Sequence, residues 1–144
     1  MFDIKPPREE LRVFTKKAMG RKYVWAGDLQ VAREFCDRHG FSLVLSDAQY
    51  QIAKIIGHGV KLVIYPHTTT STRNQHLRVR NEGGANPELA QLTMAALNRA
   101  AGGHCTFSNH WTVNPVAHRL RWDWNTDVDA LLAAEIKGGK PHDH

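Results

Sequence analysis

Two kinds of hydrophobic spacing alternate along the chain and predict its secondary structure. Short apolar runs, and runs in which apolar and polar residues alternate, predict β-strands at residues 22–25, 41–45, 60–65, 75–80, 105–107 and 117–124. Apolar residues three and four positions apart predict amphipathic helices that begin after the prolines at 6–7 and near residues 28, 46, 87 and 126. Helices and strands therefore alternate, with short connections, through most of the chain.

Capping and breaking residues place the ends of these helices. In the first helix Leu11, Phe14 and Ala18 share one face, and Gly20 ends it. The expected N-terminal caps of the later helices are Asp28, Ser46 in a capping box with Gln49, Asn86 before Pro87, and Thr126 with Asp129. The helix after Ser46 would carry Ala48, Ile52, Ile55 and Ile56 on one side.

The order strand, helix, strand, helix, strand up to residue 65 predicts a βαβαβ-like unit with right-handed parallel crossovers. A tight reversal makes the strand at 75–80 antiparallel, and a long helix and C-terminal strands follow it. We therefore expect an α/β fold, or the related α+β class, built on a mixed sheet. Residues 1–144 form one domain, in which the glycine-rich segment 137–144 is a disordered tail.

Composition and charge narrow the possible partners. Of 144 residues 42% are hydrophobic, which is enough for a core, and the formal net charge is +5. A basic protein favours polyanions such as nucleic acid or other phosphate-bearing ligands. Two cysteines, Cys36 and Cys105, make no disulfide framework and indicate a reducing, cytoplasmic setting. The chain begins without a secretory signal and has no bilayer-length apolar run, so we expect no membrane partner.

A polar loop at residues 66–75 follows the most hydrophobic strand. Hydroxyl, amide and guanidinium groups here suit phosphate oxygens, and the candidates are Thr69, Ser71, Arg73 and Asn74. The loop lacks the glycines and the Gly-Lys-Ser/Thr ending of a nucleotide P-loop. It is expected to bind phosphate in another way, or else to be a solvated hairpin loop.

Arginines recur with period two on two of the predicted strands. In the strand after the loop, alternation places Asn74, His76, Arg78 and Arg80 on one face. Arg119 and Arg121 share a face of the strand at 117–124. If both strands lie in one sheet, the four arginines form a basic platform for phosphates, and Trp111 is a candidate base contact.

Three His-x-Thr triplets begin at His67, His104 and His110. Paired triplets of this kind resemble those of the two-histidine phosphoesterases, in which histidines act as acid and base while threonines hold the phosphate. The resemblance implies proton carriers at His67 or His76 and at His110. The copies stand closer together here than in that family, and the first lacks apolar residues around its histidine.

Thiolate and imidazole groups offer a further possibility, a structural zinc held by Cys36, His39, His104, Cys105 and His110. Cys36 also continues an apolar helical stripe, and the later group has no standard zinc spacing, so no cofactor is expected.

The leading hypothesis is a nucleic-acid-binding domain that contacts mainly phosphates. The alternatives are a histidine-dependent phosphodiesterase or nuclease, and a protein–protein accessory or inhibitor module.

Overall fold

The computed structural model describes residues 12–14, 22–48, 50–68, 77–101, 106–107 and 126–138. Its strands are β1 (Arg12–Phe14), β2 (Lys22–Trp25), β3 (Ser42–Leu45), β4 (Ala53–Gly57), β5 (Val60–Tyr65), β6 (His67–Thr68), β7 (Arg78–Asn81) and β8 (Thr106–Phe107). Its helices are α1 (Ala26–His39), α2 (Pro87–Ala100) and α4 (Val128–Gly138). In these residues no helix is both long and apolar enough to cross a membrane.

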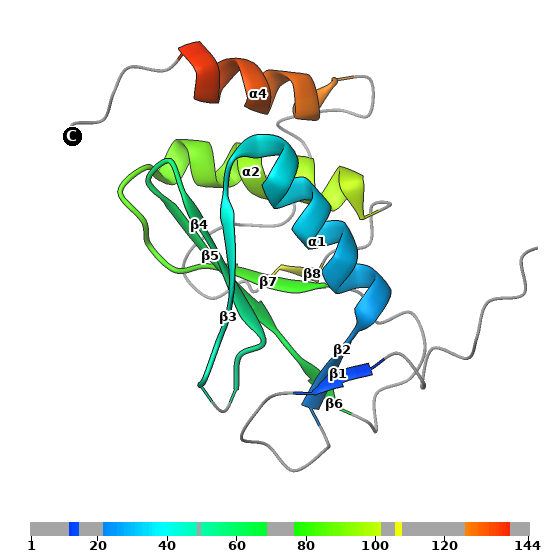
Figure 1. Cartoon of the computed structure of the whole chain (residues 1–144). Coiled ribbons are helices and arrows are strands. Elements are labelled where there is room, and N and C mark those ends of the chain that lie inside the picture. Colours follow the sequence, from blue (N-terminus) through cyan, green and yellow to red (C-terminus); the bar gives the residue numbers. More distant parts are fainter. Residues whose placement is uncertain are drawn as a thin grey trace, which may run out of the picture.

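The strands form two sheets (Figure 1). The larger has the order β3-β4-β5-β7-β8, in which the first four strands are antiparallel and β8 runs parallel to β7. The smaller has the order β1-β2-β6 and is antiparallel. The molecule is thus an α+β fold with a mixed sheet, as the hydrophobic pattern predicts.

The helices are stacked on one face of the larger sheet. α1 contacts β3 and α2 contacts β5, while α4 lies over α2 on the side away from the sheet (Figure 1). The core between these layers is fully buried and includes Phe35, Leu62, Ile64, Met94 and Leu132. One face of the sheet is therefore apolar and supports the helices, while the other face carries polar side chains together with Val44, Ile56 and Val63, the last of which is fully buried.

A two-residue hairpin joins β4 to β5 and sets their register. Gly57 pairs with Val60, and the two residues between them have positive φ, 52° at His58 and 79° at Gly59. Two successive positive φ values are the type I′ geometry, whose twist suits a tight hairpin. The loop that leads into α2 packs on this turn, because the backbone N–H of Asn86 donates to the Gly59 carbonyl at 2.8 Å.

Polar contacts hold α4 in place. The Asp129 carboxylate lies 3.0 Å from Arg38 Nη2 and 2.8 Å from His39 Nε2, both near the end of α1. Arg99 of α2 donates to the Thr126 carbonyl at 2.7 Å. Burial by itself would raise the pKa of Asp129, but the hydrogen bonds and charges of Arg38 and His39 lower it below its usual value.

Most of the expected elements are present. Strands β2, β3, β5, β7 and β8 and helices α1, α2 and α4 all overlap their predicted ranges. Asn86 caps α2 as expected, since its side chain accepts from the N–H of Leu89 at 3.1 Å. For α4 the capping side chain is Asp127 rather than Thr126, with Oδ1 accepting from the N–H of Ala130. This helix also extends to Gly138, so the first two residues of the expected disordered tail are helical.

Two predicted helices are wrong. Residues 12–14, expected within the first helix, form β1 and pair with β2, since that pairing lets Val13 pack against the core. Residues 53–57, expected in the helix after Ser46, form β4. The βαβαβ-like unit with parallel crossovers is therefore replaced by an antiparallel β3-β4-β5 meander. The predicted strand at 117–124 lies outside the described residues.

Candidate nucleic-acid interface

Basic side chains gather on the face of the larger sheet that the described helices leave uncovered. Alternation along β4 and β5 sends Ala53, Ile55, Leu62 and Ile64 into the core beneath the helices. The residues between them point to the opposite side. We call the following set the basic sheet face: Lys54 on β4, Lys61 and Tyr65 on β5, Arg78 and Arg80 on β7, and Glu82 just after β7.

Strand register brings these side chains together across three strands. Lys54 pairs with Val63, which pairs with Arg80, so these three residues form one row across the sheet. Tyr65 pairs with Arg78 in the next row. Neighbouring strands lie about 4.8 Å apart, which places the Lys54 and Arg80 backbones roughly 10 Å apart. Long side chains starting from those positions can converge on a single bound strand.

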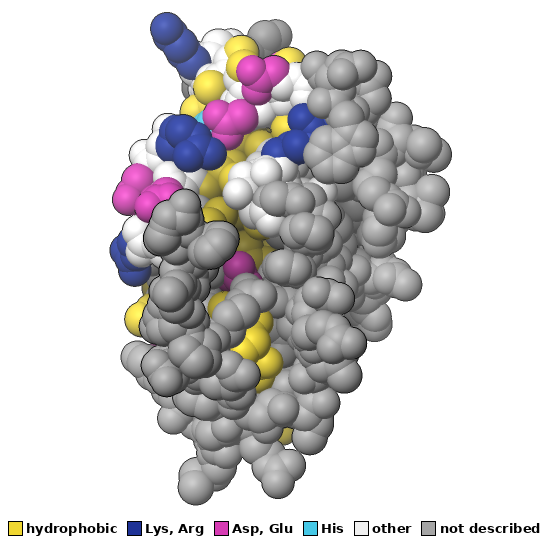
Figure 2. Space-filling view, turned by 90° about the vertical axis from the view of Figure 1, so that its right-hand side faces the viewer, with side chains coloured by type: hydrophobic (Ala, Val, Ile, Leu, Met, Phe, Trp, Pro, Cys, Tyr) yellow, Lys and Arg dark blue, Asp and Glu magenta, His cyan; other side chains and the backbone are white. Residues whose placement is uncertain are grey.

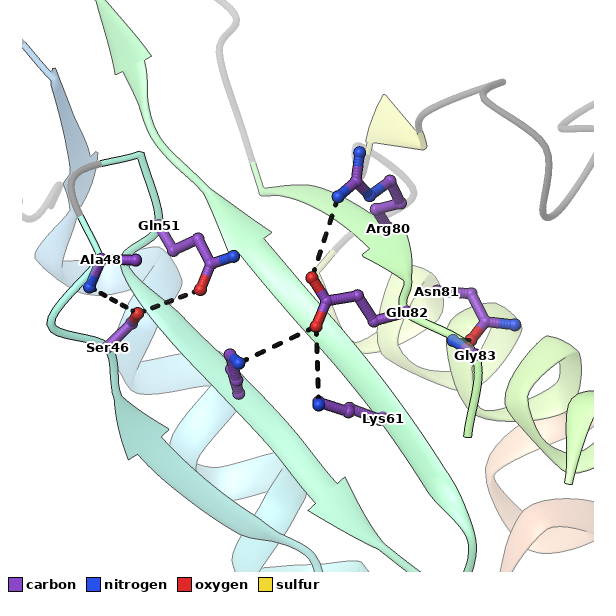
Figure 3. Close-up of polar contacts among 9 residues, drawn as sticks. Ser46, Ala48, Gln51, Lys61, Arg80, Asn81, Glu82 and Gly83 are labelled. Atoms are coloured by element: carbon purple, nitrogen blue, oxygen red, sulfur yellow. Dashed lines mark hydrogen bonds and ion pairs between the residues drawn. The ribbon is translucent and has the colours of Figure 1, made fainter. Parts of the chain in front are cut away.

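Glu82 is the acidic member of the basic sheet face. Its carboxylate lies 3.8 Å from Lys54 Nζ, 3.8 Å from Lys61 Nζ and 3.8 Å from Arg80 Nη2. Figure 3 shows the carboxylate between Arg80 on one side and Lys61 on the other. These separations are those of ion pairs and exceed hydrogen-bond length, so one negative charge is shared among three positive ones. The cluster keeps a surplus of positive charge.

Arg80 and Arg78 are further positioned by the same edge of β5. The Arg80 guanidinium lies 4.9 Å from the centre of the Tyr65 ring, a cation–π contact. Arg78 Nη1 donates to the Pro66 carbonyl at 3.0 Å. Both arginines are thus oriented by contacts with the residues at and just after the end of β5, while Arg78 stays exposed.

Another side of the molecule, shown in Figure 2, has a different distribution of charge. There the described Lys and Arg side chains lie beside Asp and Glu side chains, along a strip of hydrophobic ones (Figure 2). The basic sheet face instead has four cations, Lys54, Lys61, Arg78 and Arg80, against the single carboxylate of Glu82. Such a same-sign cluster on a sheet is suited to binding a polyanion.

Part of the expected site can be placed in the structure. Arg78 and Arg80 share one face of β7, as their alternation predicts. His67 lies in β6, where it pairs with Tyr23 of β2. The other expected site residues fall outside the described part of the chain: Thr69, Ser71, Arg73, Asn74, His76, His110, Trp111, Arg119 and Arg121.

Lys54, Lys61, Tyr65 and Glu82 are members of the face that sequence reasoning did not identify. Lys54 is not among the predicted contacts, because the hydrophobic pattern predicts a helix for its segment. Alternation runs through residues 53–55 as Ala, Lys, Ile and stops at Ile56, so the sequence carries only a short strand signal with the lysine on its polar side. Lys61 carries the same signal, a single charge within an apolar strand.

Two of the proposed zinc ligands lie in the described residues, and both are occupied otherwise. Cys36 is part of the hydrophobic core, where burial above all, and then the nearby charge of Asp37, raises the pKa of its thiol to about 12. His39 is engaged with Asp129. In the described parts of the chain no three His, Cys, Asp or Glu side chains form a metal-binding group. His104, Cys105 and His110 lie outside those parts.

Comparisons with known proteins return no relative. The chain matches no protein-family model, and no similar curated protein or solved structure was found.

Proposed function

We propose that this protein binds nucleic acid through the basic sheet face and contacts mainly the phosphate backbone. The observation that supports this best is the convergence of Lys54, Lys61, Arg78 and Arg80 from three neighbouring strands on the face opposite the helices. Each of these side chains can neutralise a phosphate, and arginine can do so with two parallel hydrogen bonds.

The charge arrangement supports a phosphate ligand over an acidic protein partner. Glu82 already lies at ion-pair distance from three of the cations, so a ligand competes with one carboxylate for a cluster that remains positive. A nucleic-acid backbone offers successive phosphate charges to cations spread over about 10 Å. Contacts of this kind carry little sequence specificity. Arg80, held in cation–π contact with Tyr65, brings a guanidinium and an aromatic ring together, and both groups can stack on bases.

The sequence-predicted contacts extend this proposal. Alternation in the sequence predicts that His76 shares a side with Arg78 and Arg80, and the predicted polar contacts Thr69, Ser71, Arg73 and Asn74 lie between β5 and β7 in the chain. Thr69, Ser71, Arg73, Asn74, Trp111, Arg119 and Arg121 remain predicted contacts. The free, buried thiol of Cys36 fits a reducing, cytoplasmic setting.

Binding can be tested by fluorescence anisotropy with labelled single- and double-stranded DNA and RNA oligonucleotides. We expect Arg80→Gln and Lys61→Gln each to weaken binding several-fold, by removing a phosphate contact. Arg33→Gln is the matched control, because Arg33 is an exposed cation on α1, on the helix-covered side of the sheet. The proposal fails if no oligonucleotide binds at low salt. It also fails if the Arg33 variant loses as much affinity as the other two.

A further inference from the structure

The outer edge of β3 has the features of an edge that can pair with another strand. β3 is the terminal strand of the larger sheet, and in the described residues no strand pairs with its outer side. Edge strands of this kind usually carry charged residues, proline or a bulge, which block pairing with other chains. β3 reads Ser-Leu-Val-Leu and has none of the blocking residues.

Hydrogen-bond parity identifies which backbone groups face outward. In the hairpin, Gly57 of β4 pairs with Val60 of β5. Counting back from Gly57, every second residue of β4 forms its backbone hydrogen bonds with β5. The residues between them form theirs with β3. The N–H of Ser46 accordingly donates to the Ile52 carbonyl at 2.9 Å. The residues of β3 that bond inward are therefore Ser42 and Val44. The N–H and C=O groups of Leu43 and Leu45 point to the outer edge.

Exposed apolar side chains are concentrated at this same edge. Val44 is 48% exposed and Leu45 49% exposed, although both lie in a strand of the main sheet. Tyr50, in the β3–β4 connection, and Ile56, on β4, are also exposed. Among large hydrophobic side chains of the described residues, only Leu131 of α4 is exposed elsewhere. Exposed apolar surface concentrated at one edge indicates an interaction site.

We propose that the partner is a second copy of this chain, whose β3 pairs antiparallel with the first across a two-fold axis at Val44. In that register Leu43 of each copy lies opposite Leu45 of the other. The outward N–H and C=O groups of these leucines then form four hydrogen bonds between the copies. The interface is isologous, as two-fold symmetry requires.

The same register also matches the faces of the two sheets. Leu43 and Leu45 lie on the helix side of β3, beside Ile55 and Ala53 of β4 respectively. Pairing Leu43 with Leu45 of the other copy makes a continuous apolar row from Ile55 of one molecule to Ala53 of the other. On the opposite face Val44 contacts its own counterpart. A single register thus satisfies backbone hydrogen bonding and side-chain burial together. An unrelated peptide would need the same alternation of apolar side chains on the two faces of its strand.

Sedimentation of the full-length protein over a range of concentrations tests the assembly. We expect wild type at tens of micromolar to sediment at twice the mass of the 16.3 kDa chain. Val44→Lys should bring the mass down to that of the monomer. Leu131→Lys, at the exposed apolar residue on α4, should leave the dimer intact. A wild-type monomer at every concentration, or a dimer that Val44→Lys does not dissociate, would overturn the proposal.

Oxidative crosslinking tests the register independently of any loss of folding. Residues opposite each other in a non-hydrogen-bonded antiparallel pair have Cα atoms about 4.5 Å apart, within the range for a disulfide. Val44→Cys should therefore yield a crosslinked dimer on oxidation. Ser42→Cys on the same strand, two residues from the axis, and the wild-type protein should yield little. A lack of crosslinking in the Val44→Cys protein, or equal crosslinking of all three proteins, would refute the pairing.

Discussion

The salt dependence of nucleic-acid binding provides a quantitative test of the basic sheet face. Each phosphate neutralised on a duplex changes the slope of log affinity against log salt concentration by about −0.9. Three cations, Lys54, Lys61 and Arg80, surround Glu82, and Arg78 lies beside them. If Glu82 cancels one of the four charges, the face contributes a slope of about −2.7, which means roughly 40-fold weaker duplex binding at 200 mM than at 50 mM salt.

Two substitutions should move this slope in opposite directions. Lys54→Gln removes one cation, and we expect a contribution of about −1.8 and roughly a 12-fold change over the same salt range. Glu82→Gln removes the competing carboxylate, and we expect about −3.6 and roughly a 150-fold change. Other phosphate contacts add equally to all three slopes, so the steps of about 0.9 between the proteins are the informative quantity.

Fluorescence anisotropy titrations at four or more salt concentrations would give these slopes, with circular dichroism to confirm that each variant is folded. Arg33→Gln should keep the wild-type slope, since its side chain lies on α1. The reasoning is refuted if folded Lys54→Gln and Glu82→Gln proteins have the same slope as wild type. It is also refuted if Glu82→Gln binds more weakly at low salt, because that would make the carboxylate a contributor to binding.

Three further predictions concern the stability of the fold, each measured by chemical denaturation. Gly84→Ala should destabilise by about 1–3 kcal/mol, because a Cβ there would lie 2.9 Å from the Lys61 backbone nitrogen; Gly27→Ala, which has open space, should not destabilise. Asn86→Ala removes the α2 cap and should cost about 1 kcal/mol, and an unchanged midpoint would contradict the capping role. Because the folded-state pKa of Asp129 is lowered from 3.8, its charge stabilises the fold above that pH, and this contribution is lost as pH falls below it. Asp129→Asn should therefore be less stable than wild type near neutral pH, and the two should converge in acid; a constant difference would contradict this.

Strong local signals were sufficient to predict much of the fold from the sequence. The apolar run at 60–65 became β5, and the Asn-Pro start with its helical apolar face became α2. Alternation placed Arg78 and Arg80 on one face of a strand without knowledge of the sheet. In each case the preference is encoded within a few consecutive residues, either as a capping hydrogen bond or as a period that only one structure can bury.

The segment after Ser46 shows what local signals leave open. The Ser46 hydroxyl does accept from the N–H of Ala48, at 3.1 Å, as a helix cap would, and Figure 3 shows that it also contacts Gln51. A short hydroxyl turn starts a helix or ends a strand equally well. Residues 52–56 are apolar enough for either a helix or a strand, so the choice depends on available partners.

Tertiary structure made that choice, and the candidate site depends on it. Only when β4 pairs with both β3 and β5 does Ile55 enter the core while Lys54 emerges beside Arg80 and Glu82. The hydrophobic pattern of the sequence determined that this chain combines strands and helices in an α+β fold. Strand register decided which cations meet on the face opposite the helices, because residues far apart in sequence become neighbours only through pairing that no short segment encodes.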